Sequence, residues 1–324
     1  MDEIHSARTF WDAEAAHPTH SSWMANPIVR EYINESISGV PGQGLWPLDW
    51  FQKTYRGRRF ARGLSVGCGT GALERDVLRR GICETMDAFD ASPASLEIAR
   101  REAAAEDVGE RVHYSLADFN RAALPRAAYD IVFFHQSLHH VSRLERLLRQ
   151  VLRALKPDGL LYLDEFVGPS RTYWNQQRIA FYRALFQYLP RDVRLCEEFA
   201  MPVQYEDLSE AIRSGEIRAR LRTGFRIAHE RGYGGNVLAM MFPDVDVGRL
   251  TDEMVRQMIR SEQSLLASGV PPFHAIIVAE PRRGALGRLA ANAVYLARPK
   301  MKRLARELRR VAARRAGADA EPWY

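Results

Sequence analysis

Three glycines and one acid are the residues whose types and spacing first indicate chemistry. Gly67, Gly69 and Gly71 stand at alternate positions after a short apolar run, and Asp90 closes the next predicted strand. Glycines at this spacing let the backbone turn tightly and let a ligand approach main-chain atoms without interference from Cβ. An acid about 20 residues further along suits the two hydroxyls of a ribose. The pattern therefore predicts a site for a ribose-bearing ligand.

The elements that must position these residues alternate between strand and helix. Such alternation implies right-handed crossovers and a mainly parallel sheet, whose ligands bind at the carboxyl ends of the strands. Asp90, Asp118, His135 and Glu165 all fall at such ends. The strands expected after the glycine loop are 84–90, 112–116, 129–134 and 160–166.

Several segments of this core, taken together, carry a specific family resemblance. They are the glycine loop, Asp90-Ala91-Ser92, Ala117-Asp118-Phe119-Asn120, Tyr129-Asp130-Ile131-Val132 and Leu155-Lys156-Pro157-Asp158-Gly159. Over roughly residues 62–166 the chain resembles the class I S-adenosylmethionine-dependent methyltransferases, whereas a nicotinamide-binding domain would share only the glycines and the acid. The resemblance implies a doubly wound, mostly parallel, seven-stranded α/β sheet of the Rossmann-like type. Its last two strands, 224–229 and 273–279, are expected to form an antiparallel pair.

The resemblance also implies roles for individual residues around S-adenosylmethionine. Backbone atoms of Gly67, Cys68 and Gly69 would line its methionine part, and Asp90 would hold its ribose hydroxyls. Asp118 would hold the adenine amine, and His135 with Gln136 would flank the sulfonium. The full set expected to bind the cofactor is Gly67, Cys68, Gly69, Gly71, Asp90, Ala91, Ser92, Asp118, Phe119, Asn120, His135 and Gln136.

Two further comparisons refine the resemblance. Many family members carry Asp or Glu where Ser65 stands, so this chain departs from the family at a position close to the cofactor's amino group. Closer similarity to a bacterial subgroup from surface-glycan and natural-product gene clusters rests on segments 46–51, 134–140, 165–171 and 233–235.

The chemistry expected of such an enzyme begins with an activated methyl group, so the protein must align a nucleophile and exclude water. If the acceptor is a hydroxyl, a base that takes its proton adds roughly 10²–10⁴-fold. The candidate bases are His139, His140 and Glu165, although histidines at this position also fit a structural role in holding the loop. His135, His139 and His140 are close in sequence, but they show no ligand spacing of a known metal site.

Three functions remain open. The leading one is methyl transfer to a small molecule, on a hydroxyl of a sugar or of a glycosylated or natural-product metabolite. A nucleic-acid methyltransferase is disfavoured, because residues 135–138 lack the Asn or Asp, two prolines and aromatic with which amino-methylating DNA enzymes hold a flipped base. A non-catalytic S-adenosylmethionine-binding module is the third; it would require a broken cofactor site.

Segments outside the core predict three regions. Residues 1–55 are expected to form an aromatic-rich helical cap, and residues 56–280 the methyltransferase domain. Helical insertions at about 170–222 and 230–272 are expected on the substrate side, and the second is a candidate substrate wall or homodimer surface. Residues 281–324 are expected to form a basic amphipathic helical tail.

The charge of the chain is concentrated in that tail. The net charge is +6, of which residues 281–324 contribute +9. A solvated helix docked on the body is the simplest interpretation. Peripheral contact with an anionic membrane is a second, and contact of the tail with nucleic acid or a partner protein is a third. No signal-peptide pattern opens the sequence, so a cytoplasmic location is expected, and no nucleic-acid partner is expected.

Overall fold

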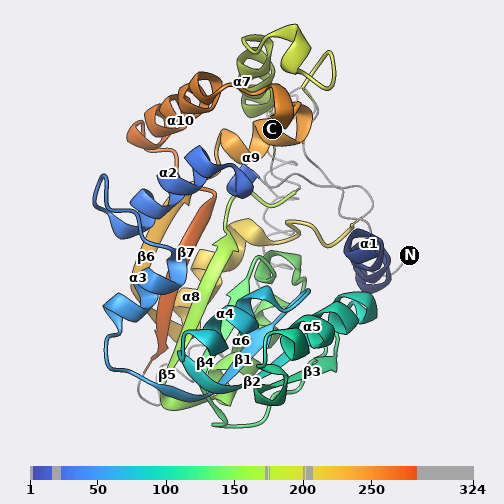
Figure 1. Ribbon diagram of the computed structural model, residues 1–324, viewed down its shortest axis with the longest axis vertical. Helices are drawn as coiled ribbons and strands as arrows, with labels where there is room; N and C mark the ends of the chain where they lie inside the picture. The colour runs from blue at the N-terminus through green and yellow to red at the C-terminus, as the bar shows by residue number, and fades with distance from the viewer. Residues whose placement is uncertain are drawn as a thin grey trace, which may run out of the picture.

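A seven-stranded sheet forms the centre of the protein, in the order β3-β2-β1-β4-β5-β7-β6 (Figure 1). The computed structural model describes residues 3–16, 23–171, 174, 176–199, 201 and 207–282. Neighbouring strands are parallel except that β7 runs antiparallel to both β5 and β6. The strands are β1 (Phe60–Val66), β2 (Cys83–Asp90), β3 (Val112–Leu116), β4 (Tyr129–His135), β5 (Leu155–Phe166), β6 (Phe225–Gly234) and β7 (His274–Pro281). The doubly wound α/β fold and its antiparallel closing pair are thereby confirmed.

Helices cover both faces of this sheet because successive strand residues point to opposite sides. Ile131 and Phe133 of β4 belong to the core on one face, and Val132 and Phe134 belong to the core on the other. The first face is covered by α2 (Pro27–Ser38), α3 (Pro47–Thr54), α4 (Ala72–Arg79) and α5 (Pro93–Ala105), and the second by α6 (Leu144–Ala154) and α8 (Ile217–Gly224).

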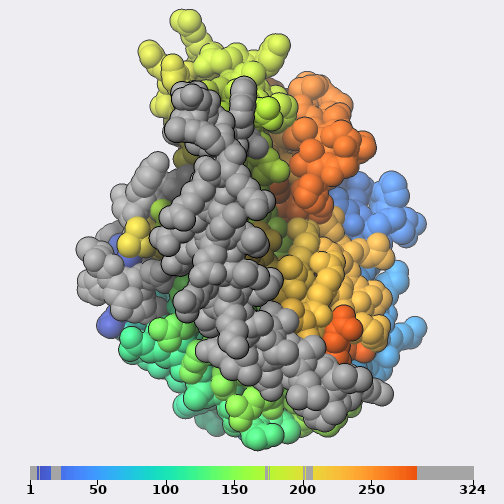
Figure 2. Space-filling view, turned by 180° about the vertical axis from the view of Figure 1, so that it is seen from behind, coloured from blue at the N-terminus to red at the C-terminus, as the bar shows by residue number. Residues whose placement is uncertain are grey.

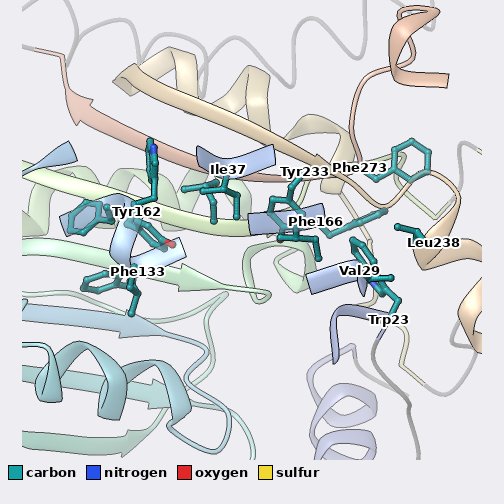
Figure 3. Close-up of a cluster of buried hydrophobic side chains, with 14 of the residues drawn as sticks. Trp23, Val29, Ile37, Phe133, Tyr162, Phe166, Tyr233, Leu238 and Phe273 are labelled. Carbon is teal, nitrogen blue, oxygen red and sulfur yellow. The ribbon is translucent and has the colours of Figure 1, made fainter. Parts of the chain in front are cut away.

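The larger core extends along the first face toward the carboxyl ends of the strands. Figure 3 shows Phe133 and Tyr162 at one end of this core and Phe166, Tyr233 and Trp23 at the other. All five side chains are at most 9% exposed. Aromatic residues of the core therefore reach the edge of the sheet at which ligands are expected.

Local signals in the sequence explain where two of the helices begin. The side chain of Asn26 accepts hydrogen bonds from the backbone N–H groups of Ile28 and Val29, with Pro27 at the first position of α2. Ser92 accepts from the N–H of Ser95 at the start of α5. Ser92 is thus the N-cap of the helix that follows Asp90.

The remaining helices gather around the same end of the sheet. Helix α1 (Glu3–Ala16) packs along α5, while α7 (Gln176–Gln187), α9 (Leu238–Met241) and α10 (Asp252–Ala267) lie beyond the carboxyl end of β5 (Figure 1). Figure 2 shows the α7 segment and α10 at this end from behind. The short 3₁₀ helices are η1 (Trp23–Ala25), η2 (Gly109–Arg111), η3 (Leu138–His140), η4 (Arg191–Val193), η5 (Ser214–Glu216), η6 (Phe242–Asp244) and η7 (Val247–Arg249).

Two features of the chain differ from the sequence-based expectation or lie beyond what the structure describes. Strand β5 begins at Leu155 rather than Leu160, with a shift of register against β4 between Tyr129 and Ile131. Beyond Arg282, the expected C-terminal tail lies outside the described residues. Within the described part of the chain, no helix combines the length and apolar character needed to span a membrane.

Candidate active site

The glycine loop turns sharply after β1 and lies against the segment that follows β4. The N–H groups of Gly67 and Cys68 both donate to the carbonyl of Phe89, at 2.9 and 3.2 Å. Gly67 has φ of +73°, and a Cβ at this position would lie 2.5 Å from Cβ of Ser137. Only glycine satisfies both the backbone conformation and the close approach.

Asp90 joins this loop to the next strand end. Its Oδ2 accepts from the N–H of Gly69 at 2.8 Å, and its Oδ1 accepts from the N–H of Ser92 at 2.9 Å. Burial raises the pKa of Asp90, and the backbone hydrogen bonds from Ser92 and Gly69 act in the opposite direction. The carboxylate is therefore fixed at the carboxyl ends of β1 and β2, with lone pairs left for a ligand.

These two segments form one wall of a cavity of about 430 Å³, here called the glycine-loop cavity. Its volume falls within the roughly 300–1,000 Å³ typical of small-ligand sites. Nine of the residues expected to bind the cofactor line it: Gly67, Cys68, Gly69, Asp90, Ala91, Ser92, Phe119, His135 and Gln136.

Gly71, Asp118 and Asn120 are not among the described residues that line this cavity. A Cβ at Gly71 would meet the hydroxyl of Tyr114 at 2.5 Å, so this glycine permits packing behind the loop. Asp118 accepts from the N–H of Asn120, and Asn120 accepts from the N–H of Arg143 at 2.8 Å. In this structure the three residues support the walls rather than face the cavity.

Helix α1 supplies a wall that the sequence motifs did not indicate. Arg8, Trp11, Glu14 and Ala15 line the glycine-loop cavity. The helix is held there by Asp12, whose Oδ1 accepts from the hydroxyl of Ser92 at 2.6 Å. The aromatic character of residues 1–55 was the only sequence signal for this contact.

A buried acid lies beside Ser65, the position at which many family members carry Asp or Glu. Glu74 of α4 has 0% exposure. Burial raises the pKa of Glu74 to about 7, although the nearby Ser65 hydroxyl lowers it. An acidic group is thus present next to the end of β1, but it comes from the following helix.

A second cavity of about 260 Å³ opens beside the first and is here called the tryptophan cavity. Gln136 lines both cavities. Its side-chain amide donates to the Tyr233 hydroxyl at 3.2 Å, and its backbone φ is +51°, a conformation uncommon outside glycine. The other lining residues are Trp23, His139, Phe166, Pro169, Arg171, Trp174, Glu210, Ala211, Ala239, Met240, Pro243 and His274.

The candidate bases His139 and Glu165 form a buried pair beside these cavities. Nδ1 of His139 is in hydrogen-bond contact with Oε1 of Glu165. Oε2 of Glu165 accepts from the N–H groups of Ser137 and Leu138, at 3.0 and 2.7 Å, and Oε1 also accepts from the N–H of Phe166. With four donors around a fully buried carboxylate, Glu165 is placed to orient His139 and not to take a proton from a ligand in either cavity.

His140 is held in a similar way by residues from a distant loop. Nδ1 of His140 lies 3.0 Å from the Ser209 hydroxyl and 3.3 Å from Oδ2 of Asp207. The Ser209 hydroxyl donates to Oδ1 of Asp207 at 2.6 Å, so its oxygen accepts the Nδ1–H of His140. With Nδ1 engaged in this way, Nε2 is the ring nitrogen that is left for other contacts.

Glu210 completes this arrangement, and nothing in the sequence singled it out. Its Oε2 lies 3.6 Å from Nε2 of His139 and 3.6 Å from Nε2 of His140. Burial lowers the pKa of His139, but Glu165 and Glu210 outweigh it and raise that pKa to about 10. We call the set His139, His140, Glu165, Asp207 and Glu210 the histidine–carboxylate cluster.

The strand order and the glycine-loop cavity at the carboxyl ends of β1 and β2 define the class I methyltransferase architecture. Residues 64–163 match the family described as a methyltransferase domain. A solved geranyl diphosphate C-methyltransferase from Streptomyces coelicolor A3(2) shares this fold, with a TM-score of 0.50 at 15% identity over 87% of this chain and 99% of that one.

Curated relatives agree with this class. The chain is 26% identical over 204 residues to a ubiquinone biosynthesis O-methyltransferase of Actinobacillus pleuropneumoniae. This alignment covers 61% of this chain and 76% of the relative. It is 34% identical over 112 residues to a 27-O-demethylrifamycin SV methyltransferase of Amycolatopsis mediterranei. That alignment covers 33% of this chain and 39% of the relative. The protein is a class I S-adenosylmethionine-dependent methyltransferase, and S-adenosylmethionine is its cofactor.

Proposed function

We propose that this enzyme transfers the methyl group to a hydroxyl oxygen of a small molecule bound in the tryptophan cavity. The observation that carries the proposal is the junction of two cavities at Gln136, one built by the glycine loop and the other bordered by His139 and Glu210. S-adenosylmethionine in the glycine-loop cavity would direct its sulfonium toward this junction. The acceptor would approach from the opposite side, as in-line displacement requires.

The walls of the tryptophan cavity favour an acceptor with an apolar ring. Trp23, Phe166 and Trp174 present aromatic surface, and Arg171 and Glu210 add polar groups at the edge. Aromatic faces of this kind accommodate phenolic rings and the apolar faces of sugar rings. One curated relative is named as a ubiquinone biosynthesis O-methyltransferase and the other as a 27-O-demethylrifamycin SV methyltransferase, and both names support an oxygen acceptor.

The hydroxyl proton would pass to the histidine–carboxylate cluster. His140, which lines the glycine-loop cavity, is the base that we favour, because its Nδ1 contacts Ser209 and its Nε2 is directed at Glu210 on the wall of the tryptophan cavity. His139, with a pKa of about 10, is positively charged near neutrality and has no ring nitrogen left to accept a proton. Its charge would stabilise the ionised Glu210 next to the acceptor.

Methyl transfer can be tested directly with a panel of acceptors. The purified enzyme would be incubated with S-adenosylmethionine labelled in the methyl group and with phenols, hydroxylated polyketides and glycosides, together with matched amines and thiols. We expect label in methyl ethers only. Label on nitrogen or sulfur acceptors, or on RNA or DNA included in the same panel, would contradict the proposal.

A further inference from the structure

Three side chains beside the two cavities bring possible metal-ligand atoms close together. Nε2 of His139, Nε2 of His140 and Oε2 of Glu210 are arranged with both nitrogens 3.6 Å from the same oxygen. One ligand atom from each residue lies within 4.8 Å of the others. The histidines are 5% and 7% exposed, and Glu210 is partly accessible from the tryptophan cavity.

We propose that His139, His140 and Glu210 bind a divalent first-row transition-metal ion. Metal–nitrogen and metal–oxygen distances of about 2.0–2.2 Å at a tetrahedral centre place neighbouring ligand atoms roughly 3.4 Å apart. The two distances of 3.6 Å are close to this value without any rearrangement. Two imidazoles with one carboxylate suit zinc, cobalt, nickel or iron better than magnesium or calcium, which prefer oxygen ligands.

The atoms behind the ligands provide a second, independent observation. Imidazoles that bind metals almost always donate their other N–H to a carboxylate, a carbonyl or a water, which fixes the ring and the tautomer. Here His139 donates to Glu165, and His140 donates to Ser209 with Asp207 at 3.3 Å. Both rings are thus held with Nε2 facing Glu210, as a three-ligand site requires.

Charge in the histidine–carboxylate cluster also favours a cation. The cluster gathers three carboxyl side chains, those of Glu165, Asp207 and Glu210, in a largely buried space. Arg171, whose guanidinium donates to the carbonyl of Asp207 at 3.1 Å, is the neighbouring positive group on the cavity wall.

The use of such an ion rests on the proposed function, whereas its binding does not. The open side of the site faces the tryptophan cavity, where an acceptor hydroxyl would become a further ligand and lose its proton to solvent. The resulting oxyanion forms the new O–CH₃ bond as the S–CH₃ bond of S-adenosylmethionine breaks, leaving S-adenosylhomocysteine. With the ion bound, activation of the hydroxyl would pass from His140 to the metal.

Sequence spacing does not reveal this site because its third ligand lies far along the chain. His139 and His140 are adjacent, but Glu210 comes from the loop that follows α7 and η4. The expectation of no metal site rested on His135, His139 and His140 alone. His135 lies instead near Asp164, with Nε2 3.8 Å from its carboxylate.

The test measures metal binding itself on the untagged full chain. After treatment with EDTA and dialysis, the protein would be titrated with Zn²⁺ against a chromogenic chelator, and with Co²⁺ while the visible spectrum is recorded. We expect one ion per chain and Co²⁺ absorption bands typical of nitrogen and oxygen ligands. Glu210→Gln should abolish high-affinity binding, and Asp207→Asn should weaken it about 10–100-fold.

Matched controls separate this site from adventitious binding. Glu84→Gln and His113→Asn change exposed residues of β2 and β3 and should leave the affinity unchanged. Retained S-adenosylhomocysteine binding by Glu210→Gln would show that this variant is folded. Absence of Zn²⁺ and Co²⁺ binding, or equal binding by Glu210→Gln and the parent, would overturn the inference.

Activity then distinguishes this inference from the proposed function. Metal binding without methylation of any hydroxyl acceptor would leave the site in place and remove the O-methyltransferase proposal. If the EDTA-treated enzyme binds neither ion and still forms methyl ethers at the full rate, the metal site is removed and the O-methyltransferase proposal stands. That result would also support His140 as the base.

Discussion

Glu165 and His139 are joined by a hydrogen bond that ties the end of β5 to the turn after β4. The same carboxylate accepts backbone N–H groups from Ser137, Leu138 and Phe166, so it orients the imidazole and closes the turn at once. We therefore expect Glu165 to act as a positioning residue, which affects the reaction only through His139.

Glu165→Gln should therefore lower turnover more than cofactor affinity. One amide N–H₂ group would face a donor that the carboxylate now satisfies, which costs about 2 kcal/mol of stability. We expect the turnover number to fall at least about 10-fold while the Kd for S-adenosylhomocysteine changes less than about 3-fold. Steady-state kinetics and calorimetric titration measure the two quantities. Equal losses in both would show that Glu165 shapes the cofactor site instead.

Asp90→Ala should remove most of the cofactor affinity. If the ribose hydroxyls donate to Asp90, loss of two hydrogen bonds to a charged group, each about 1.5–3 kcal/mol, weakens binding at least about 100-fold. The contacts of Asp90 with Gly69 and Ser92 would also disappear. Calorimetry with S-adenosylmethionine checks the result, with Asp252→Ala on the exposed face of α10 as control. Unchanged affinity would remove the ribose assignment.

Asp12→Ala should loosen α1 from the cofactor site. The variant loses the hydrogen bonds from the Ser92 hydroxyl and from the N–H of Ala94, at 2.6 and 3.2 Å. We expect cofactor affinity to fall about 10-fold, which corresponds to about 1.4 kcal/mol, and proteolysis within residues 3–16 to become faster. If bound S-adenosylhomocysteine protects residues 3–16 from proteolysis equally in the variant and the parent, the docking of α1 does not depend on Asp12.

Glu74→Gln should change how stability depends on pH. Because burial raises the pKa of Glu74 from 4.5 to about 7, its contribution is fully present below pH 4.5 and is lost as the pH rises toward 7. The loss amounts to about 3 kcal/mol. In urea unfolding, the free energy of unfolding of the variant minus that of the parent should rise by about 3 kcal/mol between pH 4.5 and pH 8. The exposed control Glu97→Gln should show no such gain; a parallel pH profile for Glu74→Gln would contradict the prediction.

Trp174→Ala should affect the acceptor and not the cofactor. Trp174 lines the tryptophan cavity and packs against Phe273, with ring centroids 5.9 Å apart. Removal of this surface should raise the KM for the acceptor about 10-fold, a loss of about 1.4 kcal/mol, and leave the Kd for S-adenosylmethionine unchanged. Tyr188→Ala, which alters an aromatic residue that is 87% exposed, is the control. If only the Kd for S-adenosylmethionine changes, Trp174 belongs to the cofactor site and not to the acceptor site.

The sequence by itself determined the sheet, the helix starts and most of the glycine-loop cavity. These features depend on neighbours along the chain. Short apolar runs define the central strands, Asn26 and Ser92 cap their own helices, and the glycines turn the backbone at their own positions. The resemblance to class I methyltransferases followed from the same local segments.

Only the tertiary structure decided which distant side chains meet. Asp12, Asp207 and Glu210 lie far in the chain from the motifs they serve, and no local pattern marks them. Glu165 is at the strand end where the sequence placed it, yet its four hydrogen bonds made it a support for His139. Such roles depend on which donors and acceptors packing brings within about 3 Å, and this distance is set by the whole fold.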